Sequence, residues 1–210
     1  MFVRKHSENN EIVRYKEHLV AQCFSQHHGI DYRETYSPVM DVITFLYLIN
    51  LVVSEKLNMQ FMDVVTTYFY GDLDTKIYMK VIEGLKLSNS NSLRPQNTLS
   101  TRLRCSLYGL KQSGWIWYNR LSKCLISQEY ENNELCPCVF IKKSHFGFLW
   151  SLQYMSMTCI SSGCWKSLRK LHHTWSQNSR RRILKKTLFY LGLELKHYAD
   201  GILVHQSNYT

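Results

Sequence analysis

Apolar residues recur at the spacing of an α-helix in two stretches of the chain. Residues 42–57 keep apolar positions three and four apart, with charges only near the end, which predicts a buried helix. Residues 115–127 show the same period with polar positions between, which predicts a second helix.

Short apolar runs predict strands around these helices. They are residues 13–24, which suit a strand of a basic β-hairpin, and residues 59–65, 77–81, 139–142, 187–197 and 201–205. Ser, Asn, Pro and Gln dominate residues 88–100, which predicts a surface loop. Strands and helices that interleave without βαβ order favour an α+β fold. Residues 149–186 carry no pattern of either period, so no element is predicted there.

The positive charge of the chain is concentrated in one segment. The 210 residues hold 26 Lys and Arg against 16 Asp and Glu, a formal net charge of +10. Eight of the basic residues, and no acidic one, fall between residues 149 and 186. The rest of the chain is close to neutral, so the excess does not by itself indicate a nucleic-acid groove.

Seven cysteines are scattered along the chain and form no pair of CxxC motifs. This spacing excludes a zinc finger and a small disulfide scaffold, so reduced thiols are expected. The first 15 residues are polar and charged, unlike a signal sequence, and no apolar run approaches the ~20 residues that span a bilayer. A cytoplasmic location without a membrane partner is therefore expected.

Two places in the chain could carry chemistry. Asp63 stands in an apolar strand pattern, where burying a carboxylate is costly unless it is paired or binds a cation. A metal ligand at a strand end and a capping aspartate both explain it. Residues 106–114 are rich in Gly, polar and basic residues just before the second helix, a composition that can approach a phosphate or a template strand. Taken alone, this stretch is better explained as an ordinary loop at a helix start.

Taken together, eight blocks of the chain resemble copia-type retrotransposon reverse transcriptases in order and spacing. The resemblance covers about residues 14–148 and 185–210. The blocks are Lys16 with Leu19-Val20-Ala21, Gly29-Ile30-Asp31-Tyr32, Glu34 to Val39, Met62-Asp63-Val64 with Gly71 and Leu73, Ile77-Tyr78-Met79 with Glu83-Gly84, Ser106 to Ser113 with Trp117-Tyr118, Cys138 to Lys142, and Tyr190 to Glu194.

The resemblance implies an incomplete right-hand polymerase fold, with fingers at about residues 1–58 and 76–115 and palm at about residues 59–75 and 116–210. The implied reaction adds deoxynucleotides to a primer along an RNA or DNA template. Template–primer and deoxynucleoside triphosphate (dNTP) are then the partners, two Mg²⁺ ions the cofactor, and a virus-like particle the setting. The resemblance assigns site residues as follows: Asp63 as catalytic metal ligand, and Lys16, Tyr68, Lys111 and Gln112 as nucleotide or template contacts.

The chain departs from this family at two places. His18 stands where the family usually has arginine, and a mostly neutral histidine lacks the bidentate grip on a triphosphate. The family's Tyr-Val-Asp-Asp hairpin is absent, because no Asp or Glu occurs from Leu135 through Leu193. One carboxylate cannot assemble a two-metal site, so the chain is expected not to polymerise. Strands beside the replaced hairpin are expected to lose their partners.

The replaced stretch fits translation in a neighbouring reading frame. When the last base of each codon joins the first two of the next, Met157-Thr158 must encode aspartate. The codons from Tyr154 onward permit the whole Tyr-Val-Asp-Asp motif, and Trp165-Lys166 must encode glutamate. We therefore hypothesise compensating frameshifts near residues 148/149 and 185/186, with a disordered or misfolded stretch at about 149–186. A divergent folded insertion is the alternative.

Three functions remain open at this point: an inactive polymerase fragment, a non-catalytic nucleic-acid-binding remnant, and a pseudogene product without function. Steep salt dependence of nucleic-acid binding favours the second, and poor folding favours the third. The Arg180-Arg181-Arg182 triplet and His172-His173 suggest nucleic-acid and metal binding, but a wrong reading frame leaves them without a selected role.

Overall fold

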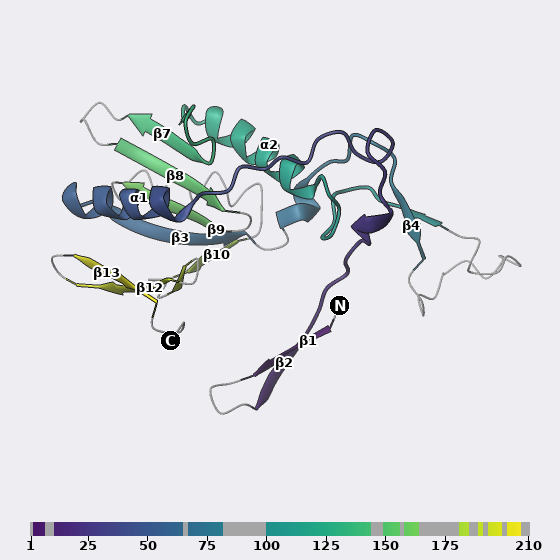
Figure 1. The fold of residues 1–210 in the computed structure, drawn as a ribbon, viewed down its shortest axis with the longest axis horizontal. Coiled ribbons are helices and arrows are strands. Elements are labelled where there is room, and N and C mark those ends of the chain that lie inside the picture. Colours follow the sequence, from purple (N-terminus) through teal and green to yellow (C-terminus); the bar gives the residue numbers. More distant parts are fainter. Residues whose placement is uncertain are drawn as a thin grey trace, which may run out of the picture. The chain divides into compact units, whose positions relative to one another are not determined.

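The chain divides into two compact units, each built from two separate segments. Unit 1 comprises Met1–Tyr36 and Tyr68–Trp117, and unit 2 comprises Ser37–Thr67 and Tyr118–Thr210. Figure 1 labels most of the elements, and each unit is described by itself. The computed structural model describes residues 2–6, 11–64, 67–81, 100–143, 149–155, 158–163, 181–184, 189–190, 193–198 and 201–206.

Unit 2 contains a six-stranded antiparallel sheet. Its order is β10–β3–β9–β8–β7–β6, so four strands consecutive in the chain, β6 to β9, form a meander and β3 lies between β9 and β10. The strands are β3 (Asn58–Val64), β6 (Glu131–Asn132), β7 (Val139–Lys143), β8 (Leu149–Met155), β9 (Thr158–Gly163) and β10 (Arg181–Leu184).

Helix α1 (Val42–Ser54) brings this sheet together with a second one in the core of unit 2. The second sheet has the order β11 (Phe189–Tyr190), β12 (Leu193–His197) and β13 (Ile202–His205). Apolar residues of α1 pack with the start of β7 and with β12, which joins segments about 150 residues apart. The buried cluster consists of Met40, Phe45, Leu48, Ile49, Cys138, Val139, Leu193 and Leu195.

Unit 1 contains two small pairs of antiparallel strands, connecting loops and a compact apolar cluster. β1 (Phe2–His6) pairs with β2 (Ile12–Glu17), and β4 (Tyr78–Lys80) pairs with β5 (Ser100–Arg102). Two short 3₁₀ helices, η1 (Cys23–Ser25) and η2 (Thr67–Tyr70), lie on the connecting segments. The cluster consists of Ile77, Leu107 and Leu110, with Ala21, Leu73, Met79 and Leu103 packed against it.

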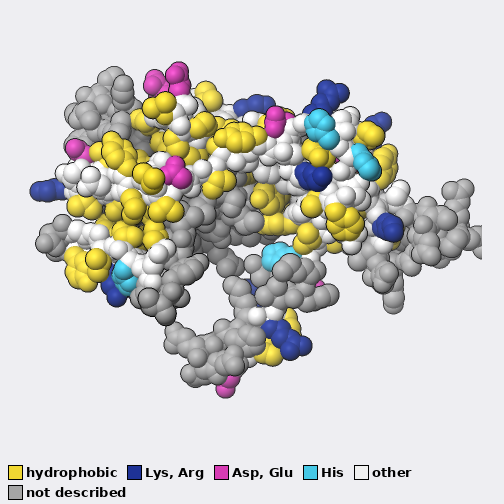
Figure 2. All heavy atoms as spheres, viewed as in Figure 1, with side chains coloured by type: hydrophobic (Ala, Val, Ile, Leu, Met, Phe, Trp, Pro, Cys, Tyr) yellow, Lys and Arg dark blue, Asp and Glu magenta, His cyan; other side chains and the backbone are white. Residues whose placement is uncertain are grey.

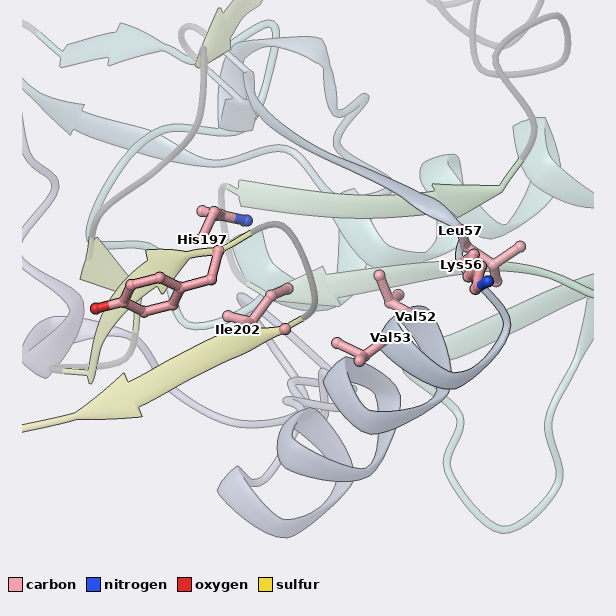
Figure 3. A pocket seen from close by; sticks show the side chains of 8 residues that line it. Val52, Val53, Lys56, Leu57, His197 and Ile202 are labelled. Atoms are coloured by element: carbon pink, nitrogen blue, oxygen red, sulfur yellow. The ribbon is translucent and has the colours of Figure 1, made fainter.

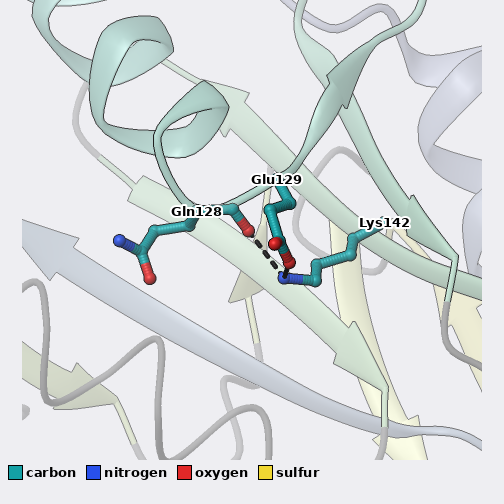
Figure 4. Close-up of polar contacts among 3 residues, drawn as sticks. All are labelled: Gln128, Glu129 and Lys142. Atoms are coloured by element: carbon teal, nitrogen blue, oxygen red, sulfur yellow. Dashed lines mark hydrogen bonds and ion pairs between the residues drawn. The ribbon is translucent and has the colours of Figure 1, made fainter.

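Helix α2 (Ser113–Ile126) starts in unit 1 and continues into unit 2. In unit 1, a Cβ atom on buried Gly71 would overlap the Ile116 side chain, so the close approach of the chain to α2 requires glycine. In unit 2, the turn after α2 is attached to β7 by Lys142, whose Nζ donates to the Gln128 carbonyl over 2.7 Å and pairs with Glu129 over 2.7 Å (Figure 4). Because the Glu129 side chain is 85% exposed, the ion pair contributes little and the carbonyl hydrogen bond is the firmer tie.

Most predicted elements agree with the structure over the described residues. The two helices begin within two residues of their predicted starts, and β3, β7, β12 and β13 lie inside or next to predicted strands. The mixture of helices with antiparallel sheets confirms the α+β class. The strand predicted at residues 13–24 is shorter, because β2 ends at Glu17 and η1 follows. The loop predicted at residues 88–100 lies outside the described residues except for its last one.

The expectation of a disordered or misfolded stretch at 149–186, beside unpaired strands, is wrong for the parts of it that the structure describes. β8 and β9 pair with each other, β8 with β7, and both β9 and β10 with β3. Such a sequence can form strands without a clear period, because strand formation depends on neighbouring strands more than on intrinsic preference. Residues 156–157, 164–180 and 185–186 lie outside the described residues.

The surface of the described residues combines exposed apolar groups with dispersed charge. On α1, Val42, Ile43, Leu46 and Tyr47 are exposed, Ile43 by 81%. On the face seen in Figure 2, Lys and Arg side chains are scattered rather than gathered in one patch. None of the described helices is long and apolar enough to cross a membrane.

Candidate functional site

Asp63 lies in β3, between β9 and β10 of the large sheet. By backbone register its partners are Thr158 of β9 and Arg182 of β10. Thr158 is the first residue of β9, and residues 156 and 157 connect β8 to β9. The backbone therefore brings Asp63 level with the end of the β8–β9 hairpin, the place where the missing carboxylates were expected.

Residues 106–113 in unit 1 form a tight loop held by buried hydroxyl groups. Ser106 Oγ donates to Ser113 Oγ over 2.7 Å, and Ser113 Oγ donates to the Leu107 carbonyl over 2.7 Å. Gly109 has a φ of +89°, and a Cβ atom there would overlap the Ala21 carbonyl. Glycine is the residue that tolerates both constraints.

Gln112 is buried inside this loop, with 2% of its surface exposed. Its Nε2 donates to the Asp31 carbonyl over 3.0 Å, and its Oε1 accepts from Gln26 Nε2 over 3.1 Å. The side chain predicted to contact nucleotide or template thus links the segment around residues 26–31 to the start of α2. Its role toward a nucleotide stays a prediction.

Lys111, the preceding residue, is exposed and held at two points. Its backbone N–H donates to Gln26 Oε1 over 2.9 Å. Its Nζ donates to Tyr32 Oη over 3.2 Å and to the Gln26 carbonyl over 3.4 Å, and lies 5.0 Å from the Tyr32 ring centroid. Within the described residues no carboxylate lies within ion-pair distance of Lys111. The ammonium group is therefore ordered without being neutralised.

Tyr68 joins an aromatic cluster around Tyr108. The Tyr108 ring makes edge contacts with Tyr68 at 4.9 Å, with His18 at 5.6 Å and with Phe69 at 6.3 Å between centroids. Burial raises the pKa of the Tyr68 phenol, so it stays protonated at neutral pH. The structure therefore brings Tyr68 and His18, which are 50 positions apart in the sequence, into contact with the same ring.

Lys16, the remaining residue predicted to contact nucleotide or template, is paired with Val3 in the β1–β2 hairpin, and its side chain lies outside the described residues.

Sequence reasoning missed Gln26, Asp31 and Tyr32 as partners of Lys111 and Gln112. Asp31 and Tyr32 belong to a family block, but no spacing signal connects Gln26 with Gln112, 86 positions later.

A cavity of about 470 Å³ lies in unit 2 between the end of α1 and the β12–β13 hairpin (Figure 3). Its lining includes two basic residues, Lys56 and His197, and is otherwise mostly apolar. None of the predicted site residues lines it.

A family model described as reverse transcriptase (RNA-dependent DNA polymerase) matches residues 1–210. This chain belongs to the reverse transcriptase family. It is 33% identical over 156 residues to the retrovirus-related Pol polyprotein from transposon TNT 1-94 of Nicotiana tabacum, which covers 74% of the chain and 11% of the relative. It is 27% identical over 213 residues to the Pol polyprotein from transposon RE2 of Arabidopsis thaliana, which covers 100% of the chain and 14% of the relative.

A yeast relative extends the comparison. The chain is 26% identical over 128 residues to the transposon Ty1-ER2 Gag-Pol polyprotein of Saccharomyces cerevisiae, covering 53% of the chain and 7% of the relative. These relatives confirm the resemblance to copia-type retrotransposon Pol polyproteins, and the chain spans 11% to 14% of the length of the plant relatives. No solved structure matches the chain.

Reverse transcriptases generally use divalent metal ions, and the residues around Asp63 do not fit a two-ion site. Hard cations such as Mg²⁺ bind carboxylate oxygens. The positions paired with Asp63 hold threonine and arginine, and the chain from Leu135 through Leu193 contains no Asp or Glu. Among the described residues, no group of three or more His, Cys, Asp and Glu side chains could hold a metal.

Proposed function

We propose that this reverse transcriptase domain does not catalyse templated nucleotide addition. The observation that carries the proposal is the neighbourhood of Asp63: β3 lies beside β9 and β10, and neither strand nor their connections supply a carboxylate. A single carboxylate cannot hold two ions about 4 Å apart and neutralise the charge of a transferring phosphoryl group.

Primer extension tests this proposal. The chain is incubated with an RNA template, a labelled DNA primer, dNTPs and Mg²⁺, beside its Asp63→Ala variant. We expect equal, background incorporation by both proteins. Clear incorporation by the unaltered chain that is lost in Asp63→Ala would overturn the proposal.

The same proposal extends to the architecture and the reading frame. We propose that unit 1 corresponds mostly to the fingers and unit 2 mostly to a palm whose central hairpin is β8–β9. The bounds differ from those that the resemblance implies, because residues 37–58 belong to unit 2 and residues 68–75 to unit 1. The proposal is supported by the position of that hairpin, since the neighbouring frame permits the Asp pair at the two residues joining β8 to β9 and requires one of the two aspartates. Sequencing codons 145–190 tests it, and the absence of an open neighbouring frame encoding Tyr-Val-Asp-Asp would contradict it.

Non-catalytic binding of nucleic acid is the second candidate function, and Lys111 favours it. An exposed, ordered and unneutralised cation beside a helix start suits a phosphate group. We expect binding of an RNA/DNA duplex that weakens steeply with salt and survives Asp63→Ala. Equal binding at 50 mM and 300 mM salt would contradict this function.

A further inference from the structure

The loop that contacts Lys111 has a shape defined by its own hydrogen bonds. The His27 backbone N–H donates to the Asp31 carboxylate over 2.8 Å, and the Asp31 N–H donates back to the His27 carbonyl over 2.9 Å. The Gly29 N–H donates to the Tyr32 carbonyl over 2.8 Å, with Gly29 at a φ of +83°. These bonds hold the backbone of Tyr32 in one place.

The same loop is attached to the start of α2 by bonds that do not involve the Lys111 ammonium. Gln112 Nε2 donates to the Asp31 carbonyl, Gln26 Nε2 donates to Gln112 Oε1, and the Lys111 N–H donates to Gln26 Oε1. Thr75 Oγ1 also donates to the Asp31 carbonyl over 3.1 Å. Tyr32 and the Lys111 backbone therefore have a defined separation before any ligand binds.

The way Lys111 is held differs from the way two other lysines of the described residues, Lys142 and Lys196, are held. Lys142 and Lys196 lie within 2.7 Å and 3.6 Å of the Glu129 and Glu194 carboxylates, which compensate their charge. Lys111 instead meets a phenol, a carbonyl and an aromatic ring, which are all neutral. A lysine ordered in this way keeps its full charge and has already lost side-chain freedom that binding would otherwise remove.

Solvent exposure also distinguishes Lys111 from its neighbours in the segment 106–113. All eight residues from 106 to 113 are described, and Lys111 alone among them is exposed. Gln112, Ser106 and Ser113 are each at most 2% exposed and serve the loop itself. The family block therefore presents one polar side chain to solvent.

We infer that Tyr32 is a positioning residue that holds the Lys111 ammonium for contact with a phosphate group. The phosphate belongs either to the backbone of a template–primer duplex or to a dNTP. The inference rests on the proposed nucleic-acid binding and adds to it the residue that orders the contact. Gln26 also holds Lys111, since its Oε1 accepts from the Lys111 backbone N–H and its carbonyl accepts from Lys111 Nζ.

The first arm of the test measures the contribution of the Lys111 charge. Binding of the full chain to a fluorescein-labelled RNA/DNA duplex is followed by anisotropy between 50 and 300 mM salt. Lys111→Met should weaken binding by roughly tenfold at 0.1 M salt and reduce the slope of log K against log salt by about 0.9. Lys76→Met removes an equal charge from another exposed position of unit 1 and should stay within about twofold of the unaltered chain. The inference is overturned if the two variants have equal effects on duplex binding and also on the binding of dTTP.

The second arm measures positioning by Tyr32. Tyr32→Phe removes the Oη atom and keeps the ring, so we expect about threefold weaker binding with an unchanged salt slope. In the Lys111→Met background the same change should have no effect, because the group it positions is gone. Tyr36→Phe, on an exposed tyrosine of the same unit, is the matched control. Additive effects of Tyr32→Phe and Lys111→Met would show a merely structural role and overturn the inference.

The third arm distinguishes the source of the phosphate. Direct binding of dTTP is measured for the same variants by calorimetry. A reduced duplex salt slope in Lys111→Met assigns the backbone phosphate, whereas weaker dTTP binding with an unchanged slope assigns the triphosphate. If Lys111→Met shows neither of these changes, the inference is overturned. If the unaltered chain binds neither the duplex nor dTTP, both the proposed binding function and the inference fail. If it binds one of these ligands and Tyr32→Phe does not change the affinity for it, only the inference fails.

Discussion

Within the segment from Ser106 to Ser113, neighbouring residues serve different purposes. The serine hydroxyls and the Gln112 carboxamide satisfy buried hydrogen bonds, Gly109 permits close approach to Ala21, and Lys111 points its charge to solvent. Substitutions in this segment should therefore divide into those that reduce stability and those that reduce binding.

Gly109 provides a test of close approach. Gly109 and Gly29 both have positive φ, but a Cβ atom meets the Ala21 backbone at Gly109 and nothing within 4 Å at Gly29. Gly29→Ala should cost about 1–2 kcal/mol of unfolding free energy from backbone strain. Gly109→Ala should cost clearly more, because the overlap adds to the strain. Urea denaturation measures both, and equal losses would show that the approach to Ala21 relaxes freely.

Gln112 provides a test of the buried carboxamide. Gln112→Ala leaves the Asp31 carbonyl and Gln26 Nε2 without this partner and opens a small cavity, so we expect a loss of about 2–3 kcal/mol. Gln22→Ala, on an exposed side chain that makes no capping bond, should change the unfolding free energy by less than about 0.5 kcal/mol. Similar values for the two variants would argue against a structural role of Gln112.

Among the elements, α1 is the one for which the structure explains most clearly why the helix begins where it does, at Val42. Asp41 accepts hydrogen bonds from the Thr44 N–H and the Thr44 hydroxyl, each over 2.8 Å, which makes it the N-cap. The Thr44 backbone and side-chain bonds hold the pKa of the Asp41 carboxyl below its usual value. The helix then places Phe45, Leu48 and Ile49 in the core of unit 2.

The cap predicts a pH dependence. Because the pKa of Asp41 is lower in the folded chain, its stabilising effect is complete above the unfolded pKa of about 3.9 and is lost as the pH falls through the folded value. Asp41→Ala should therefore lower stability at pH 7 and approach the unaltered chain at the acidic end. Asp41→Asn keeps an acceptor and should lose less at pH 7. Urea unfolding midpoints of the three proteins between pH 2.5 and 7 measure this pH dependence. If Asp41→Ala lowers stability by the same amount at every pH, the prediction is contradicted.

At the scale of the whole molecule, the charge and the sheet pairing lead to different conclusions about the same segment. Residues 149–186 hold eight of the 26 basic residues and no acidic one, which alone suggests an anionic partner. Its described parts nevertheless form β8, β9 and β10 in the large sheet, next to Asp63. In the proposed palm, the segment takes the place of a metal-binding hairpin while carrying the opposite charge.

Restoring the neighbouring frame across residues 149–185 is the whole-molecule prediction. The replaced chain gains the Asp pair beside β3, so Mg²⁺-dependent primer extension should rise at least roughly tenfold above that of the unaltered chain. Adding Asp63→Ala should abolish the gain. As a control, the same restored segment with its two aspartates changed to asparagine should stay at background, and equal activity of this control would contradict the hypothesis.

Some features of this protein could be derived from the sequence, because they are local or concern composition. The periods of α1 and α2, the apolar strand around Asp63 and the lack of acidic residues from Leu135 to Leu193 are such features. The tertiary structure alone decided that β8 and β9 pair beside β3, that Gln112 is buried, and that Tyr32 and Gln26 hold Lys111. The physical reason is that a local pattern indicates which face of an element is apolar, whereas burial and hydrogen-bond partners depend on segments far away in the sequence, as with Gln26 and Gln112, 86 positions apart.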